Sequence, residues 1–146
     1  MNKEQTFVML KPDCIKRGLI GEVISRIEKK GWRIVGARTR MLDPGFLYTF
    51  YAHIKEQPYF LDVFNYMLSG KVLGIVVEGE GVLMGMRRLI GSTIIDDALP
   101  GTIRGDFAVS SENNLIHASH NEENVKTECD IFFTWSKDRE TAESGK

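Results

Sequence analysis

The residues best suited to chemistry lie in one segment, residues 100–119, where Arg104 and His117 stand among turn-forming residues. An arginine presents a planar fork of N–H donors that matches phosphate or carboxylate. An imidazole is poised near neutrality and can act as a base or a nucleophile. The cations that could join them are Lys11, Arg87, Arg88 and Arg104. Together these types favour an anion site, although each alone is more often a structural, solvated or ion-paired group.

Any phosphate binding here must be built from side chains. The chain contains no GxxxxGK[ST] segment, no GxGxxG segment and no protein-kinase catalytic-loop signature, so a backbone cradle for phosphate is not indicated. Arginine forks, a lysine and hydroxyl groups are the remaining means of holding phosphate oxygens. The residues alone therefore predict a possible anion site and do not name a reaction.

The candidate segment belongs to an unusually long loop, expected over residues 91–114. A loop of about twenty residues inside a compact domain usually has a function. Gly101 and Gly105 flank Arg104, and glycine allows a sharp turn or a close approach to a ligand.

The elements that would position this loop follow from hydrophobic periodicity. The apolar run Phe7–Leu10, stopped by Pro12, predicts a buried strand. Strands are expected at 7–10, 32–42, 72–77 and 131–135; helices at 19–30, within 46–56, and at 60–68, 82–90 and 121–128; and a turn at 43–45. This order predicts an α+β fold, a ferredoxin-like βαββαβ core whose four-stranded antiparallel sheet is covered by helices on one face.

Length and charge restrict the class of protein. The 146 residues suit one domain, 1–146, with a polar tail at 137–146 that we expect to be flexible. The net charge of −1 provides no broad basic field for nucleic acid or an anionic membrane. No apolar run is long enough to span a bilayer, and the N-terminus resembles no signal peptide, so a cytoplasmic location is expected.

Three segments together resemble the nucleoside diphosphate kinase family. Residues 8–13 (VMLKPD) are similar to its first-strand motif, residues 100–107 (PGTIRGDF) to its arginine loop, and residues 114–119 (NLIHAS) to its active-site segment. Arg87, Gly91, Thr93, Tyr51 and the stretch 58–60 also fall at the family spacing, and the similarity runs in order over residues 5–135. So long a joint pattern is highly specific.

The resemblance implies a role for each matching residue. His117 would take the γ-phosphate of a nucleoside triphosphate and pass it to a nucleoside diphosphate by a ping-pong mechanism, supported by Ser119 and Glu128. Lys11 and Asn114 would hold the ribose, with Lys11 also reaching the phosphate. The remaining matches would be phosphate ligands or neighbours of the transferred group (Arg87, Thr93, Arg104 and Tyr51) and a base-stacking ring (Tyr59).

The family also implies partners. Mg²⁺ would arrive bound to the nucleotide phosphates with no dedicated protein ligands, and stacking alone would leave base choice broad. A homo-oligomer is implied, with a hexamer as the first expectation and a tetramer or dimer open. Ile94 and Ile95, an apolar pair in the long loop, are predicted to lie at a subunit contact.

Two positions depart from the family pattern. His120 stands where the family usually has aspartate, which predicts reduced or pH-shifted activity, and Ser111 replaces an apolar neighbour of the base. These departures keep one alternative open, a catalytically weak nucleotide-binding regulator. A second alternative is a nucleic-acid-binding module of the same βαββαβ order, but the chain has neither an RNP1-like segment nor a basic excess.

Overall fold

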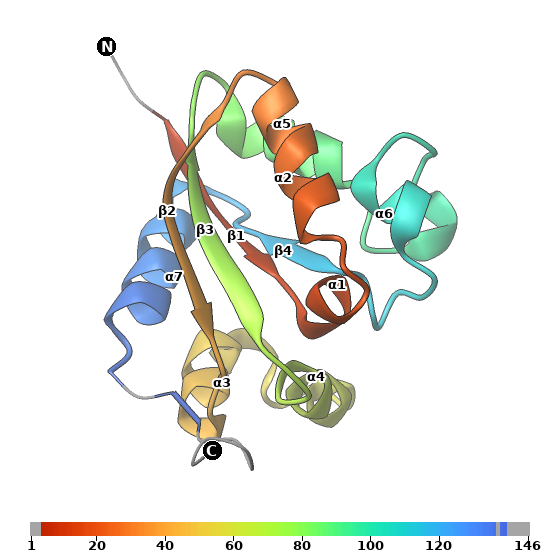
Figure 1. Ribbon diagram of the computed structural model, residues 1–146. Helices are drawn as coiled ribbons and strands as arrows, with labels where there is room; N and C mark the ends of the chain where they lie inside the picture. Colours follow the sequence, from red (N-terminus) through yellow and green to blue (C-terminus); the bar gives the residue numbers. More distant parts are fainter. Residues whose placement is uncertain (1–3, 137, 140–146) are drawn as a thin grey trace.

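A four-stranded antiparallel sheet forms the centre of the molecule (Figure 1). The computed structural model describes residues 4–136 and 138–139. The strands are β1 (Gln5–Leu10), β2 (Arg33–Arg40), β3 (Val72–Glu78) and β4 (Ile116–Ala118), in the order β2-β3-β1-β4. Every neighbouring pair is antiparallel, which confirms the predicted α+β, ferredoxin-like core.

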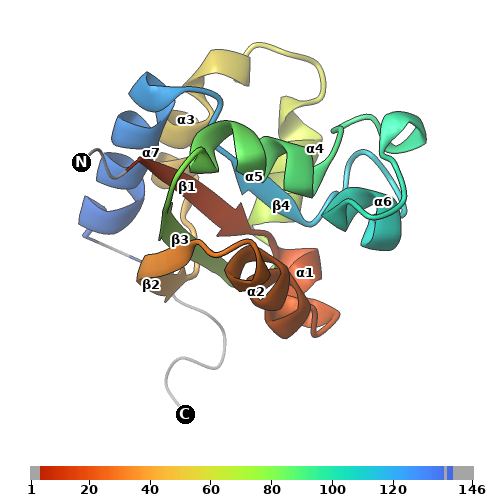
Figure 2. The same cartoon turned by 90° about the horizontal axis from the view of Figure 1, so that it is seen from above.

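Helices cover both faces of this sheet, as the view from above shows (Figure 2). The prediction that one face alone is covered is therefore wrong. The helices are α1 (Pro12–Lys16), α2 (Ile20–Lys29), α3 (Pro44–Phe50), η1 (Ala52–Ile54), α4 (Phe60–Met67), α5 (Val82–Ile90), η2 (Ile95–Asp97), α6 (Ile103–Phe107) and α7 (Glu122–Thr134).

The alternation of side chains along β1 explains the two-sided packing. Val8 and Leu10 join the apolar cluster formed with α2 and α5, while Phe7 and Met9 join the cluster formed with α3, α4 and α7. Successive residues of a strand point to opposite faces, so a strand buried on both sides must be apolar throughout. The continuous apolar run at 7–10 is the sequence signature of this arrangement.

The end of the chain differs from the prediction. Residues 131–134 form the last turn of α7 instead of a strand, and the fourth strand is the short β4. The aromatic run resembles a strand, but its role is to fill space between a helix and the sheet. The ring of Phe132 lies where a Cβ on Gly74 of β3 would come within 2.4 Å of it, so the glycine admits the helix.

Two smaller expectations also change. Residues 43–45 are not a free turn: Asp43 caps α3 by accepting a hydrogen bond from the backbone N–H of Phe46, and Pro44 occupies the first turn. The predicted loop at 91–114 contains η2 and α6. Of the tail at 137–146 only Asp138 and Arg139 are described, and Asp138 accepts a hydrogen bond from Arg40 at 2.7 Å; the rest lies outside the described residues.

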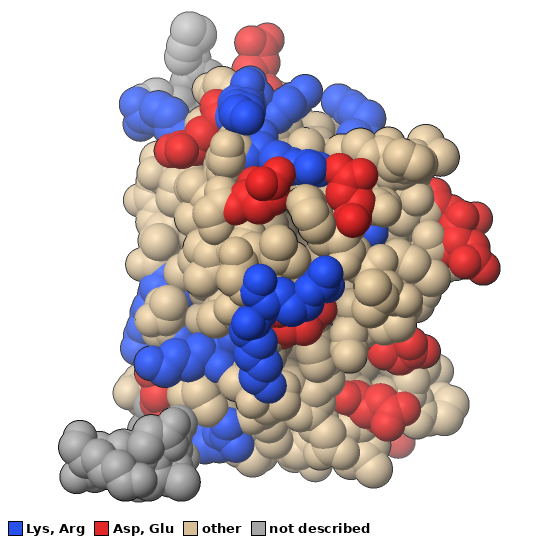
Figure 3. Space-filling model, turned by 45° about the vertical axis from the view of Figure 1, so that its right-hand side comes forward, with Lys and Arg blue, Asp and Glu red and all other residues tan. Residues whose placement is uncertain are grey.

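The surface carries charges of both signs. Figure 3 shows basic and acidic side chains interspersed on the face it presents, with neither sign covering it. Among the described residues no helix is long and apolar enough to cross a membrane.

Candidate active site

His117 is held at the middle of β4 and faces Met9 of β1 in the antiparallel register. The residue two positions earlier, Leu115, is buried and adopts a positive φ of 76°, which is uncommon for a side chain branched beyond Cβ. Its carbonyl accepts the backbone N–H of Lys11 at 2.8 Å. This bond ties the turn before β4 to the end of β1, so the strained residue directly precedes the strand that carries His117.

One nitrogen of the His117 ring is occupied by a carboxylate. Nε2 lies 2.9 Å from Oε1 of Glu128, and the same oxygen accepts the hydroxyl of Ser119 at 2.7 Å. Burial tends to raise the pKa of Glu128, but hydrogen bonds from His117 and Ser119 and the nearby imidazoles bring it below its ordinary value. Because an ionised carboxylate only accepts hydrogen bonds, Nε2 must carry the proton.

The other ring nitrogen, Nδ1, therefore carries the lone pair. No described residue hydrogen-bonds to Nδ1. Rings of Phe50 and Tyr51 pack edge-on against the imidazole, with centroids 5.3 and 6.5 Å away. The imidazole is thus fixed in tautomer by Glu128 and in orientation by aromatic packing.

Arg104 braces the surrounding backbone. Its guanidinium donates to the carbonyl of Asn114 at 3.2 Å, to that of Gly91 at 3.0 Å and to that of Ile116. Burial, and after it the charge of Arg87, lowers the pKa of Arg104 to about 10. With three of its five N–H groups engaged by carbonyls, the side chain keeps donors for an anion.

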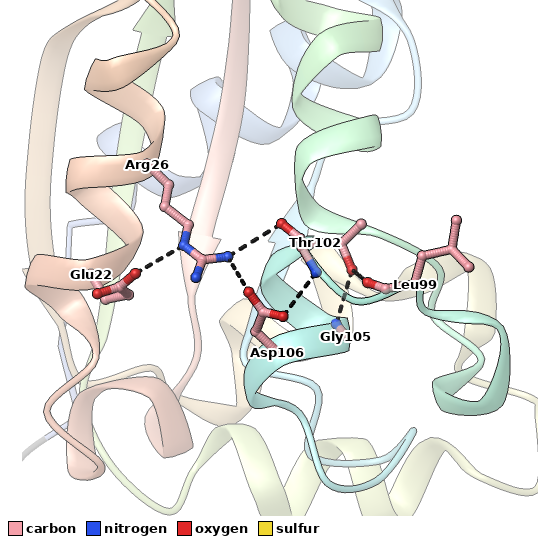
Figure 4. Close-up of polar contacts among 7 residues, drawn as sticks. Glu22, Arg26, Leu99, Thr102, Gly105 and Asp106 are labelled. Atoms are coloured by element: carbon pink, nitrogen blue, oxygen red, sulfur yellow. Dashed lines mark hydrogen bonds and ion pairs between the residues drawn. The ribbon is translucent and has the colours of Figure 1, made fainter.

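A network between α2 and α6 fixes the helix that carries Arg104 (Figure 4). Arg26 of α2 contacts Glu22 at 2.9 Å and Asp106 of α6 at 2.8 Å. Asp106 also accepts the backbone N–H of Gly101 at 2.8 Å. Thr102 caps α6 by accepting from the backbone N–H of Gly105 at 2.9 Å. The arginine is therefore presented by a helix that is anchored at its start and along its flank.

The two loop glycines serve the chain itself. Gly101 has a φ of 97°, which a side chain rarely adopts. A Cβ on Gly105 would lie 1.9 Å from the carbonyl oxygen of Leu99, so this position must be glycine for the loop to close. The predicted sharp turn is found at Gly101. The close approach at Gly105 is to the backbone of Leu99.

A small cationic cavity of about 70 Å³ opens in front of the histidine. Its lining comes from α5, the long loop, α6, β4 and the start of the connection to α7: Arg87, Ile90, Gly91, Thr93, Arg104, His117, Ala118 and His120. Four predicted site residues, Arg87, Thr93, Arg104 and His117, are thus brought together. The volume is too small for a nucleoside and the guanidiniums suit a phosphate.

A larger cleft of about 550 Å³ contains three further predicted residues, Lys11, Tyr59 and Asn114, whereas Tyr51, Ser119 and Glu128 line neither space. Its lining is Lys11, Tyr59, Asp62, Val63, Tyr66, Ser111, Glu112, Asn113 and Asn114. This volume lies within the range of small-ligand pockets. Tyr59, at the start of α4, is 50% exposed and offers an open ring face.

Lys11 and Asn114 connect the two cavities. Nζ of Lys11 donates to Oδ1 of Asn114 at 2.8 Å, and the backbone carbonyl of Asn114 accepts from Arg104. Burial, followed by the charge of Arg104, lowers the pKa of Lys11 to about 7, and Asp13 offsets part of this shift. An anionic ligand near this lysine would favour the protonated form, so anion binding and protonation of Lys11 would stabilise each other.

Tyr51 has a buried hydroxyl that finds no hydrogen-bond partner in the described part of the chain. Burial raises the pKa of Tyr51, as does the charge of Glu128. Buried polar groups are normally paired, so an orphaned hydroxyl beside His117 is suited to a ligand oxygen.

Sequence reasoning missed some of the lining. Asp62 and Tyr66 were not singled out, although they follow Tyr59 at offsets of three and seven, which places them on one face of a helix. The hydroxyl of Tyr66 donates to Asp13, one residue past the lysine–proline pair. Helical spacing from Tyr59 was the signal that could have found them.

The donor set in the small cationic cavity suits phosphate better than a bare metal ion. Its charged or titratable members are two arginines and two histidines. Within residues 4–136 and 138–139, no group of three or more His, Cys, Asp or Glu could hold a metal. A divalent cation would fit here as part of a metal–nucleotide complex, whose phosphates supply the oxygen ligands.

Comparison with known proteins agrees with this geometry. The family model described as "Nucleoside diphosphate kinase" matches residues 4–137. The nucleoside diphosphate kinase of Ignicoccus hospitalis is 48% identical over 130 residues, covering 89% of this chain and 88% of that protein. The enzyme of Moorella thermoacetica is 41% identical over 134 residues, covering 92% and 96%.

Solved structures of the same name share the fold. A halophilic nucleoside diphosphate kinase from Halobacterium salinarum in complex with CDP has a TM-score of 0.88 at 36% identity, covering 99% of this chain and 97% of that one. The enzyme from Encephalitozoon cuniculi has a TM-score of 0.87 at 37% identity, covering 95% and 94%. These matches favour the enzyme over the regulatory or nucleic-acid-binding alternatives, and the chain belongs to the nucleoside diphosphate kinase family.

Proposed function

We propose that this chain moves the γ-phosphate of a nucleoside triphosphate onto a nucleoside diphosphate, with His117 as the phosphate carrier. The arrangement of the imidazole is the observation that carries the proposal. Glu128 holds Nε2 at 2.9 Å, and His117 lines a cavity that also contains Arg87 and Arg104. A nucleophile of fixed tautomer beside fixed cations is what phosphoryl transfer through a covalent intermediate requires.

The reaction consists of two mirror-image half-reactions at one nitrogen. The Nδ1 lone pair of His117 attacks the γ-phosphorus, the bond to the β,γ-bridging oxygen breaks, and the nucleoside diphosphate leaves with that electron pair. Glu128 stabilises the positive charge that develops on the ring through the Nε2–H bond. A second diphosphate then attacks the phosphorus through its terminal oxygen, and the ring regains its lone pair.

The cationic groups lower the barrier by position and charge. Phosphoryl transfer spreads negative charge over the equatorial oxygens, so preorganised donors provide most of the catalysis. Arg87, Arg104 and Thr93 line the cavity where that charge would develop. The unpaired hydroxyl of Tyr51 is a further donor for the transferred group.

The larger cleft would hold the nucleoside. Tyr59 offers a ring for stacking, and Lys11 and Asn114, joined at 2.8 Å, would share the ribose hydroxyls. Every base has a π-face, so stacking predicts broad base tolerance. Mg²⁺ would enter with the nucleotide, where it neutralises phosphate charge.

Assembly and location remain predictions from the sequence. The side chain of Ile94 is 58% exposed, while Ile95 is partly buried in η2. An exposed isoleucine in the long loop supports a subunit contact there, with a hexamer as the first expectation. Mass measurement in solution tests the oligomer, and cell fractionation tests the proposed cytosolic compartment.

The decisive experiment is incubation with γ-labelled ATP followed by GDP. We expect label first on the protein, as an acid-labile and base-stable phosphohistidine, and then on GTP. His117→Ala should lose both steps by at least about a thousandfold, while His53→Ala, a matched histidine outside the cavity lining, should retain them. A chain that binds nucleotide but never becomes labelled would instead be the regulatory relative.

A further inference from the structure

All three histidines of the chain lie around one site. His117 and His120 both line the small cationic cavity. His53, in η1, has its ring 6.4 Å from that of Tyr51, which in turn lies 6.5 Å from the ring of His117. The chemistry proposed above uses His117 alone among these histidines, which leaves the exposed imidazole of His120 in the small cationic cavity without an assigned role.

The position of His120 suits contact with an anion. It follows β4 by two residues and precedes Asn121, the cap of α7. Arg87 and Arg104 line the same cavity, and the charge of Arg87 acts on the His120 ring. An imidazolium near an arginine is costly in the free protein and favourable once a phosphate neutralises the group.

The charges around His120 come from several elements. Burial, then the positive charges of Arg87 on α5 and His117 on β4, lowers the pKa of His120; Glu128 on α7 opposes this shift, and His53 on η1 adds to it. In the free protein the protonated form of the ring is therefore disfavoured. A phosphate group in the cavity reverses the balance, because its charge favours the protonated ring.

We propose that His120 is a phosphate-binding residue that takes up a proton when a nucleoside triphosphate binds and donates a charge-assisted hydrogen bond to its terminal phosphate. This inference rests on the proposed function, since it assumes that the cavity holds that phosphate. The consequence is a nucleotide affinity that depends on His120 strongly at acidic pH and weakly at alkaline pH. Hydrogen bonds of charged groups are markedly stronger than neutral ones.

The test is the pH dependence of binding for a non-transferable ATP analogue with a β,γ-imido bridge. We compare the dissociation constants of wild type and His120→Gln between about pH 5.5 and pH 8.5, a span that brackets the ordinary imidazole pKa. Protonation of the ligand and of other site groups affects both proteins alike, so the ratio isolates His120. We expect the variant to bind about tenfold more weakly at the acidic end and less than about threefold more weakly at the alkaline end.

Two variants and a second ligand sharpen the result. His120→Arg keeps a charge at every pH, so relative to wild type it should bind the analogue about equally at acidic pH and more tightly at alkaline pH. His53→Gln removes an imidazole of the same neighbourhood that does not line the cavity, and should leave the ratio near one. AMP, which lacks the terminal phosphates, should show no dependence on His120.

A His120→Gln ratio that stays flat across the pH range, or that equals the ratio of His53→Gln, would overturn the inference. Calorimetry in two buffers of different ionisation enthalpy provides an independent readout: wild type should take up more protons than His120→Gln on binding. Labelling of His117 by γ-labelled ATP is measured separately. Loss of labelling would reject the proposed function, whereas a flat ratio with normal labelling rejects only the role of His120.

Discussion

The small cationic cavity, where we propose that phosphate binds, and the larger cleft, where we propose that the nucleoside binds, differ in how firmly their residues are held. Around the cavity, His117 is fixed by Glu128 and Arg104 by three backbone carbonyls. Along the cleft, Tyr59 is half exposed and Asp62 and Glu112 lie at the surface. Positioning within fractions of an ångström matters where bonds change and matters much less where a base stacks. The residues are therefore held most firmly where we propose that phosphoryl transfer takes place.

The difference predicts that substitutions behind the cavity lower kcat and that substitutions in the cleft raise KM. Removing an interaction made mainly in the transition state lowers kcat, while removing uniform binding raises KM with kcat unchanged. The four predictions that follow begin with the largest expected effect.

Glu128→Gln should lower kcat by about a hundredfold with little change in KM. A glutamine amide can present N–H groups to Nε2 of His117, which favours the tautomer whose proton is on the attacking nitrogen. Steady-state kinetics with ATP and GDP checks this result. Glu123→Gln, on the exposed side of the same helix, is the matched control. If both variants keep kcat within about threefold, the fixed tautomer is not needed.

Tyr59→Leu should raise KM for purine nucleotides by about tenfold and leave kcat nearly unchanged, because stacking of a base contributes about 1–3 kcal/mol. Tyr59→Phe keeps the ring and should restore the wild-type KM. KM values for ATP and GTP, measured on all three proteins, decide the matter. A fall in kcat without a rise in KM would contradict a role for Tyr59 in binding the base.

Lys11→Met should change how stability depends on pH. The pKa of Lys11 falls from 10.5 to about 7 on folding, so between these values the unfolded chain binds the extra proton and wild-type stability rises with pH. Between about pH 6.5 and pH 8.5 we expect a gain of about 2 kcal/mol in the free energy of unfolding, absent from the variant. Arg104 and Cys14, with pKa values of about 10 and about 12, titrate above this window.

Urea unfolding of the free protein at these pH values measures that difference. Lys16 of α1 is exposed. Lys16→Met is therefore the control, and its stability should follow the pH dependence of wild type. Parallel curves for wild type and Lys11→Met would show that the lysine is not held in the uncharged form.

Arg26→Met should have the smallest effect, a fall in kcat of about threefold or less. The ion pair with Asp106 supports α6, but exposed pairs contribute little, and Asp106 keeps its bond to Gly101. Initial-rate assays compare it with Arg33→Met, an exposed arginine 3.6 Å from Glu78 and remote from the loop. A fall in kcat larger than that of Glu128→Gln would show that the α2–α6 network matters more for the rate than the tautomer of His117.

Much of the scaffold could be predicted because local and tertiary preferences agree there. Residues 82–90 form a helix with the predicted bounds, since one apolar face coincides with one buried face. The prediction of a strand at residues 131–135 was wrong because an aromatic run fits a strand and a packed helix equally well. The ring of Phe132 packs on Gly74 of β3, and only this contact with the sheet distinguishes the helix from a strand.

The same limit applies to the site. Helical spacing from Tyr59 would have indicated Asp62 and Tyr66, but nothing local marks Leu115 as a left-handed residue. Nor does the sequence show that Arg104 donates three hydrogen bonds to backbone carbonyls. Such roles depend on which acceptors the fold brings within reach.

The sequence by itself determined the family and predicted the reactive residues, because three ordered motifs specify side-chain types suited to phosphate. The tertiary structure decided the states of those residues. Lys11 and Asn114 meet across 103 positions of chain, and Glu128 reaches His117 from a separate helix. Tautomer, charge and pKa depend on distance and burial in space, and those quantities exist only once the chain has folded.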